Sequence, residues 1–199
     1  MAKTSFRPLL IVLAGPPGSG KTTLAHALAR EIRCPAICRD EIKEGLVNSI
    51  TSSGAPPTDE IQRHTNDVFF ETIHSLLRHG VSLVAEAAFQ HKIWAPRLEP
   101  LLTMAASTRV IVCTVDPALA RARHVERGLA DPERERFHGD AVVQAAREGR
   151  TLPLTDYDPP RLDVPTLGVN TSNGYSPTFD EVVAFARGHD AAGEVANKS

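Results

Sequence analysis

The feature that most constrains the fold of this chain is the stretch GPPGSGKT, which runs from Gly15 to Thr22. Before it lies LLIVLA, residues 9–14, a continuous apolar run that predicts a strand buried on both faces. After it lies an Ala- and Leu-rich segment, about 22–33, that predicts a helix. The stretch matches the pattern GxxxxGK[ST] in full, and the strand–loop–helix context disfavours a chance match. We therefore expect a phosphate-binding loop at this point of the chain.

The chemistry of such a loop explains its residue types. Glycines let backbone N–H groups point at a phosphate chain, and the following helix adds its positive end. We expect Lys21 to place a cation on the terminal phosphates and the Thr22 hydroxyl to ligate Mg²⁺. The expected nucleotide-binding residues are Gly15, Pro16, Pro17, Gly18, Ser19, Gly20, Lys21, Thr22 and Thr23.

Strand and helix patterns alternate along the rest of the chain, which favours an α/β fold. Further strands are expected at 36–38, 81–87, 109–115 and 164–169. Further helices are expected at 40–49, 58–79, 94–104, 117–127 with Gly128 as its end, 141–148 and 178–187. This order predicts the three-layer sandwich of a P-loop NTPase, a five-stranded parallel sheet with helices on both faces. Ligands of such sheets bind beyond the carboxyl ends of the strands.

The whole chain has a size and composition that suit one domain. It has 199 residues, of which 42% are hydrophobic, enough for a sizeable core. We expect a single domain at 1–188 with a lid at about 128–150, and a flexible tail at 189–199. The formal net charge of −2 disfavours nucleic acid as a partner, although a local basic patch stays open.

Cysteine usage and hydropathy indicate a cytoplasmic protein. Cys34, Cys38 and Cys113 form no CxxC pair, and we interpret them as buried, reduced side chains. Only a short polar lead precedes the first strand, and no apolar run approaches the about 20 residues that cross a bilayer. We expect no membrane contact.

Among P-loop proteins, small kinases fit the remaining features best. Regulatory GTPases need an [NT]KxD segment after a late strand, and the corresponding stretch here, NTSN at 170–173, has neither Lys nor Asp. Motor and transporter ATPases need larger domains and further signatures. Small kinases need little beyond the loop, a carboxylate beside the acceptor and a mobile lid that carries arginines.

Two carboxylates are candidates for the chemistry. Asp40 follows the second expected strand, at the same sheet edge as the loop, where it could orient an acceptor hydroxyl; the alternative is a plain helix N-cap. Glu86 lies in an otherwise apolar strand. Burying its carboxylate there without a partner would cost roughly several kcal/mol. Magnesium near Thr22 would be a suitable partner, and the alternative is an exposed strand end.

Two arginines are candidates for the lid. Arg123 and Arg127 are four residues apart and therefore lie on one face of the expected helix. There they could neutralise charge on a transferring phosphoryl group as a lid closes. The alternative is a solvated basic end of a helix.

These segments together resemble a family of small P-loop kinases. The chain is similar to the kinase domain of bacteriophage polynucleotide kinase, chloramphenicol phosphotransferase and the zeta toxins, from Leu9 to about Gly128. The shared segments are GPPGSGKT, then CRDEIK at 38–43, then RARHVERG at 121–128. The resemblance implies ATP as the phosphate donor, together with Mg²⁺.

The resemblance also assigns roles to particular residues. Asp40 would be the general base, Lys43 would contact substrate, and Arg127 with Arg123 would be the lid arginines. The phage-type enzyme has Arg where this chain has Lys43, which puts a bidentate phosphate contact in doubt. The family usually has Asp where this chain has Glu86.

The sequence therefore predicts an ATP-dependent kinase that phosphorylates a hydroxyl of a small molecule, such as a nucleoside, a sugar or an antibiotic. A polynucleotide 5′-hydroxyl kinase and a non-catalytic ATP-binding switch remain as alternatives. The acceptor pocket is expected beside the helix at 58–79 and the segment 89–97, with Phe89, Gln90 and Trp94 as candidate contacts.

Overall fold

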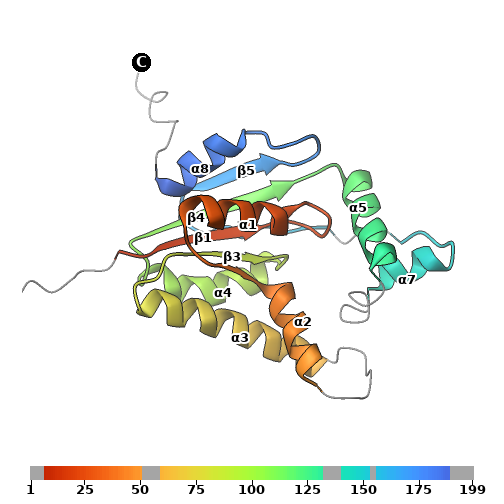
Figure 1. Ribbon diagram of the computed structural model, residues 1–199, viewed down its shortest axis with the longest axis horizontal. Coiled ribbons are helices and arrows are strands. Elements are labelled where there is room, and N and C mark those ends of the chain that lie inside the picture. Colours follow the sequence, from red (N-terminus) through yellow and green to blue (C-terminus); the bar gives the residue numbers. More distant parts are fainter. Residues whose placement is uncertain (1–6, 51–58, 132–139, 153–155, 189–199) are drawn as a thin grey trace, which may run out of the picture.

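Helices and strands alternate along the computed structural model of the protein, which describes residues 7–50, 59–131, 140–152 and 156–188 (Figure 1). The strands are β1 (Leu9–Ala14), β2 (Ala36–Cys38), β3 (Leu83–Ala87), β4 (Ser107–Thr114) and β5 (Thr166–Asn170). The helices are α1 (Lys21–Ile32), α2 (Arg39–Ser49), α3 (Asp59–Arg78), α4 (His91–Leu102), α5 (Pro117–Ala130), α7 (Ala141–Arg147) and α8 (Phe179–Arg187).

The strands form one parallel sheet with the order β2-β3-β1-β4-β5. The central strand β1 is almost wholly buried, because it has a neighbour on each side and helices above and below. All strands run the same way, so their carboxyl ends share one edge of the sheet. This arrangement confirms the predicted α/β P-loop fold.

Side chains of β1 alternate between two hydrophobic layers, as the period of a strand requires. Leu10 and Val12 pack into a cluster with residues of α3 and α4. Ile11 and Leu13 pack into a second cluster with residues of α1 and α8 on the opposite face. Figure 1 shows these two helix pairs on either side of the sheet, which confirms the three-layer prediction.

Some helix ends differ from the predictions. Gly128 does not end α5, which continues to Ala130; Gly128 is buried, and its carbonyl accepts a hydrogen bond from Arg147 Nη2 at 3.4 Å. Asp40 is not an N-cap either, since α2 begins at Arg39 with Cys38 at the cap position.

Most other bounds agree with the predictions to within one residue. Differences of two or three residues occur where α4 begins at His91 despite its internal prolines, and where β3 begins at Leu83, β4 at Ser107 and β5 at Thr166. Within the predicted lid, α7 is described, whereas residues 132–139 lie outside the described residues, as does the predicted tail at 189–199.

Three helices lie near the carboxyl edge of the sheet. Figure 1 shows α5 and α7 beyond the ends of the strand arrows, and α2 begins directly after the end of β2. Across the described part of the chain, a helix with the length and apolarity to cross a bilayer is not found. Because ligands of parallel sheets bind beyond the carboxyl ends of the strands, these three helices border the expected site.

Candidate active site

The loop between β1 and α1 has the backbone geometry of an anion site. Gly18 and Gly20 adopt left-handed conformations, with φ of 78° and 72°. Gly20 is the N-cap of α1 and supplies no side-chain cap, and the first turn of the helix contains no acidic residue. Its first N–H groups therefore keep their capacity to bind an anion, and the helix dipole favours a negative charge there.

This loop is packed tightly against its neighbours. A Cβ atom at Gly18 would lie 2.0 Å from the carbonyl oxygen of Ala120 in α5, so no other residue fits. The Thr171 hydroxyl, buried just beyond β5, lies 2.8 Å from the carbonyl oxygen of Ser19 and 3.1 Å from that of Thr114. The Ser19 hydroxyl itself is buried, and within the described residues it has no hydrogen-bond partner. It thus leaves a donor inside the loop for a ligand.

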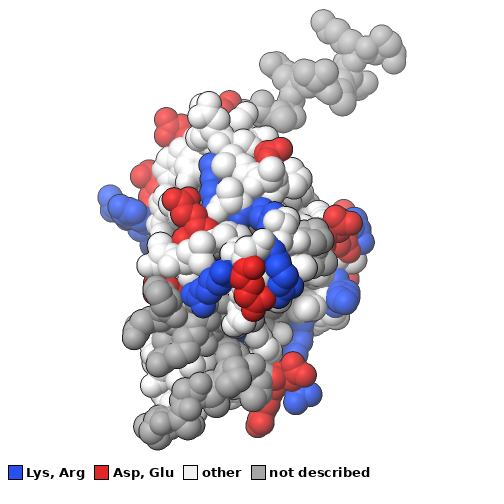
Figure 2. All heavy atoms as spheres, turned by 90° about the vertical axis from the view of Figure 1, so that its right-hand side faces the viewer, with Lys and Arg blue, Asp and Glu red and all other residues white. Residues whose placement is uncertain are grey.

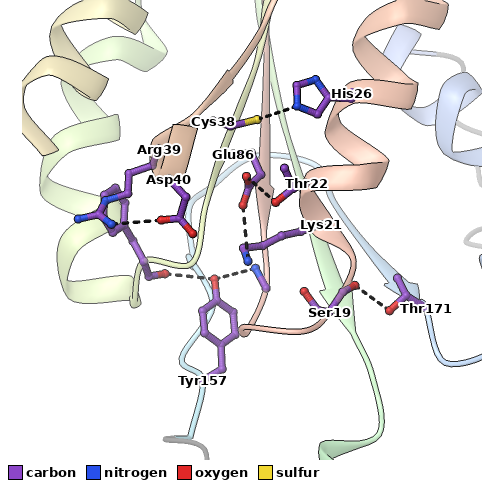
Figure 3. A network of polar contacts seen from close by, with 12 residues as sticks. Ser19, Lys21, Thr22, His26, Cys38, Arg39, Asp40, Glu86, Tyr157 and Thr171 are labelled. Carbon is purple, nitrogen blue, oxygen red and sulfur yellow. Dashed lines mark hydrogen bonds and ion pairs between the residues drawn. The ribbon is translucent and has the colours of Figure 1, made fainter. Parts of the chain in front are cut away.

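Lys21, Thr22 and Glu86 form one connected group at the carboxyl edge (Figure 3). Lys21 Nζ lies 3.6 Å from Glu86 Oε1, and the Thr22 hydroxyl donates to Glu86 Oε2 at 3.1 Å. Glu86 is only 2% exposed, so the predicted alternative of an exposed strand end does not hold. Burial raises the pKa of Glu86, the Lys21 ammonium lowers it, and the Asp40 carboxylate raises it further.

Thr22 and Glu86 suit a magnesium ion chemically. They present a hydroxyl and a carboxylate oxygen, the hard ligands that Mg²⁺ prefers. Strand register explains why they meet: Glu86 pairs with Leu13, one residue before the end of β1, and the loop then returns the chain to Thr22. A cation beside Glu86 would also offset the cost of burying its carboxylate.

Asp40 lies in the first turn of α2, directly after β2. The pairing of Cys38 with Glu86 brings this turn next to the loop, and Figure 3 shows the Asp40 carboxylate directed toward the space beside Lys21 and Glu86. Arg39 Nη1 donates to Asp40 Oδ1 at 3.1 Å. The structure therefore brings Asp40 together with the phosphate-binding loop, as the sequence predicted.

Arg39 is a positioning residue that sequence reasoning missed. Its Nε donates to Asn66 Oδ1 at 3.2 Å, and its Nη2 donates to Gln62 Oε1, both on α3. Its guanidinium carbon also lies 5.9 Å from the ring centroid of Phe89. Four contacts hold this guanidinium, so its orientation relative to Asp40 is fixed by α3. The motif CRDEIK contained the residue, but the partners on α3 are distant in sequence.

Lys43, the predicted substrate contact, is 2% exposed, on the buried face of α2 one turn after Asp40. Lys43 is therefore a buried lysine and not part of the solvent-exposed face of α2.

The two predicted lid arginines differ in their surroundings. Arg123 donates from Nη1 to the carbonyl oxygen of Thr171 at 3.0 Å and from Nη2 to that of Ser172 at 3.1 Å. Its guanidinium therefore links α5 to the loop after β5. Arg127 is exposed on the next turn of α5. The structure does not place both guanidinium groups in the same surroundings, although they share a helix.

A side-chain hydrogen bond connects α5 to α7. His124 Nε2 lies 2.9 Å from Asp140 Oδ2, and Asp140 Oδ1 accepts hydrogen bonds from Val142 N and Val143 N at the start of α7. The hydrogen bond to His124 is the largest cause of a lowered pKa at Asp140. One carboxylate thus both caps α7 and attaches it to the helix that packs on the loop.

Tyr157 is a second site residue that the sequence did not reveal. Its hydroxyl accepts a hydrogen bond from Gly15 N at 3.0 Å and donates one to the carbonyl oxygen of Phe89 at 3.1 Å (Figure 3). Burial raises its pKa, so the hydroxyl keeps its proton. Tyr157 comes shortly after α7 and lies in no motif, so only the folded chain shows that it contacts the phosphate-binding loop.

The candidate acceptor contacts have other partners. Trp94 is fully buried, in an aromatic cluster with Phe69, Phe70 and Phe89. The Gln90 side chain is held by backbone: its Nε2 donates to Asp156 O at 3.0 Å, and its Oε1 accepts from Asp158 N at 2.6 Å. Trp94 and Phe89, predicted as contacts of the acceptor pocket, thus pack in the core, and Gln90 holds the backbone of a loop.

Fold and site together define an α/β P-loop nucleotide-binding protein. The chain belongs to the AAA domain family, whose family model matches residues 10–153. That match includes the loop, both candidate carboxylates, and the two candidate arginines Arg123 and Arg127.

Two curated relatives match this chain over only part of their own length. The subunit RuvB of the Holliday junction branch migration complex from Prosthecochloris aestuarii is 29% identical over 118 residues, which is 56% of this chain and 34% of RuvB. The replication factor C large subunit of Pyrobaculum aerophilum is 87% identical over 23 residues, 12% of this chain and 6% of that protein. The chain thus spans about a third or less of these relatives.

Solved structures match over nearly the full length. A provisionally assigned kinase from Chloroflexus aurantiacus superimposes with a TM-score of 0.72 and 25% identity, covering 93% of this chain and 99% of that one. The APS kinase CysC of Mycobacterium tuberculosis superimposes with a TM-score of 0.56 and 17% identity, covering 94% and 98%. These neighbours confirm the predicted P-loop kinase fold.

Proposed function

We propose that this protein is an ATP-dependent kinase that transfers the γ-phosphoryl group of ATP to a hydroxyl of a small molecule. The observation that carries the proposal is the convergence of Asp40, from the end of β2, with the group formed by Lys21, Thr22 and Glu86. A protein that only binds a nucleotide would not need a carboxylate such as that of Asp40 beside this loop, whereas a kinase needs one to orient the acceptor hydroxyl. The kinase name of the Chloroflexus neighbour supports the same activity.

In this proposal the loop N–H groups and Lys21 hold the phosphate chain, and Asp40 accepts a hydrogen bond from the acceptor hydroxyl. The acceptor oxygen attacks the γ-phosphorus, the bond to the β–γ bridging oxygen breaks, and the hydroxyl proton passes to Asp40 as ADP leaves. A carboxylate can serve although it is a weak base, because the transition state is loose and the proton leaves late. When bound through Thr22 and Glu86, Mg²⁺ would neutralise charge on the phosphates.

The lid arginines divide their roles in this proposal. Arg127, exposed on α5, is the candidate to approach the transferring group when the lid closes. Arg123, with its guanidinium on the carbonyls of Thr171 and Ser172, fixes the loop after β5 against α5. Arg123 would therefore stabilise the backbone next to the nucleotide site and would not contact the phosphates.

Charge at the carboxyl-edge face favours a small acceptor over a polynucleotide. Figure 2 shows Lys and Arg interspersed with Asp and Glu over the described part of the face that lies at the right of Figure 1. Binding of a polynucleotide relies on clustered positive charge that follows its phosphates. The mixed pattern and the net charge of −2 instead suit an acceptor that contacts only the inner groups, such as Lys43.

The test is phosphoryl transfer from γ-labelled ATP to pooled nucleosides, sugars, aminoglycosides, chloramphenicol and 5′-hydroxyl oligonucleotides, with products identified by mass spectrometry. Asp40→Asn should keep ATP affinity and lower turnover by about 10²-fold or more, since general-base catalysis contributes roughly that much. Asp67→Asn is the matched control, because Asp67 is an exposed aspartate on α3 paired with Arg97.

Full turnover in Asp40→Asn would remove Asp40 from the proposed role. If wild-type protein binds ATP and transfers phosphate to no member of the panel, the alternative of a non-catalytic switch replaces the kinase. Labelled oligonucleotide as the product would instead establish the polynucleotide alternative.

A further inference from the structure

A second group of ligand-type side chains lies beside the phosphate site and has no part in the proposed transfer. His26 comes from α1, Cys38 is the last residue of β2, and Glu41 lies in the first turn of α2. Their ligand atoms all lie within 4.8 Å of one another. His26 Nε2 is 2.6 Å from Glu41 Oε1 and 3.7 Å from Cys38 Sγ, and Figure 3 shows the imidazole facing the thiol.

We propose that His26, Cys38 and Glu41 form a binding site for a transition-metal ion of the zinc type. An imidazole nitrogen, a thiolate sulfur and a carboxylate oxygen are the three kinds of ligand that Zn²⁺ takes in proteins. Three protein ligands leave a fourth position for water. A thiolate is a poor ligand for Mg²⁺, so this site differs in selectivity from the oxygen pair of Thr22 and Glu86.

The burial of the three side chains suits a metal that enters from solvent. Cys38 is 2% exposed, at the inner end of the group. The side chains of His26 and Glu41 are 47% and 49% exposed, so the outer side is open to water and to an arriving ion. Binding would exchange the S–H bond of Cys38 for a sulfur–metal bond, and the thiol proton would pass to solvent.

Chain geometry explains why the two sites are neighbours with separate ligands. His26 lies one turn after Thr22 on the same face of α1, and Cys38 pairs with Glu86 across β2 and β3. An ion bound to His26, Cys38 and Glu41 would join α1, β2 and α2. It would therefore hold the turn of α2 that contains Asp40.

The test uses the untagged full chain, freed of metal by a chelator and without nucleotide, so its outcome is independent of kinase activity. Titration with Co²⁺ should give one equivalent of binding and the near-ultraviolet charge-transfer absorption of a cobalt–thiolate bond. Titration calorimetry with Zn²⁺ in buffers of different ionisation enthalpy should show release of a proton.

Variants assign the ligands. Cys38→Ser should abolish the charge-transfer absorption, and His26→Gln and Glu41→Gln should each lower Zn²⁺ affinity at least about tenfold, as loss of a ligand must exceed loss of an outer-shell partner. Cys34→Ser is the matched control, because Cys34 is also a free cysteine and lies outside the group. Circular dichroism checks that each variant is folded. Because the side chains of His26 and Glu41 are about half exposed, we expect their variants to fold like the wild type.

Three outcomes would overturn the proposal. They are a wild-type protein without the cobalt–thiolate absorption, unchanged Zn²⁺ affinity in both His26→Gln and Glu41→Gln, and an absorption that disappears in Cys34→Ser but persists in Cys38→Ser.

Discussion

Gly18 shows how a single residue sets the shape of the phosphate-binding loop. Its φ of 78° favours glycine, and a Cβ atom there would lie 2.0 Å from a backbone oxygen of α5. Gly18→Ala therefore adds left-handed strain of about 1–2 kcal/mol and overpacking of about 1–3 kcal/mol. We expect a loss of roughly 2–5 kcal/mol in the free energy of unfolding, measured by urea denaturation, together with loss of ATP binding.

Gly174 provides the control for this substitution. Its φ is 73°, close to that of Gly18, but a Cβ atom there would meet nothing within 4 Å. Gly174→Ala should therefore lower the free energy of unfolding by only about 1–2 kcal/mol, the cost of the left-handed strain. Equal losses in the two variants would mean that the contact with α5 does not shape the loop.

Glu86 predicts a pH dependence of nucleotide binding. Because burial raises its pKa above 4.5, ionised Glu86 destabilises the nucleotide-free fold at high pH, and this cost is relieved as pH falls through the raised pKa. Protonated Glu86 cannot ligate Mg²⁺, so affinity for Mg·ATP should fall as pH falls through the same range. Titration calorimetry at a series of pH values measures this change.

Glu86→Gln removes the titrating group and should bind Mg·ATP more weakly, with no such pH dependence. Glu99→Gln, at an exposed position on α4, should keep both the affinity and the pH profile of the wild type. The magnesium role of Glu86 would be refuted by an unchanged pH profile in Glu86→Gln.

At the scale of elements, the segment 156–158 connects the start of α4 to the phosphate-binding loop. Gln90 and His91 hold the backbone of residues 156–158 through three hydrogen bonds, and Tyr157 reaches from this segment to Gly15. The first residue of the phosphate-binding loop is therefore fixed by a segment about 140 residues away in sequence.

Tyr157→Phe tests that connection. The substitution leaves Gly15 N and Phe89 O without their partner, which costs about 1–3 kcal/mol of stability. We expect the KM for ATP to rise several-fold with a smaller change in kcat, in steady-state kinetics with the acceptor that the panel identifies. A purely structural role would lower stability and leave KM unchanged.

Tyr175, the other tyrosine of the chain, is the matched control. It packs against Phe179 with ring centroids 6.1 Å apart, and it lies against the hydrophobic cluster on the α1 and α8 face of the sheet. Tyr175→Phe should leave the KM for ATP as it is in the wild type.

At the scale of the whole molecule, local patterns were enough for the fold but only for part of the site. The apolar run of β1, the loop motif and the alternation of strands with helices predicted the parallel sheet and its layers, because these signals lie in contiguous segments. Asp40 and Glu86 were found because both follow or end buried strands that share one sheet edge.

The remaining site residues depend on contacts between distant segments. Arg39 is oriented by α3, Tyr157 reaches the loop from beyond α7, and His26 meets Cys38 across two elements. Single-sequence patterns hold no record of such pairs. For the same reason Trp94 looked like a candidate pocket residue, and only its packing among Phe69, Phe70 and Phe89 shows that it belongs to the core.

The charge of the whole molecule leads to the last prediction, which separates a small acceptor from a polynucleotide. A protein that neutralises 6–10 phosphates loses about 10³–10⁵ in affinity between about 50 and 200 mM salt. With a net charge of −2 and charges of both signs on the carboxyl-edge face, we expect weak binding of a fluorescent 5′-hydroxyl oligonucleotide and a loss below about tenfold over that range. Fluorescence anisotropy against salt concentration measures the slope. A steep slope with tight binding at low salt would show that local basic groups outweigh the net charge, and it would favour the polynucleotide alternative over a small acceptor.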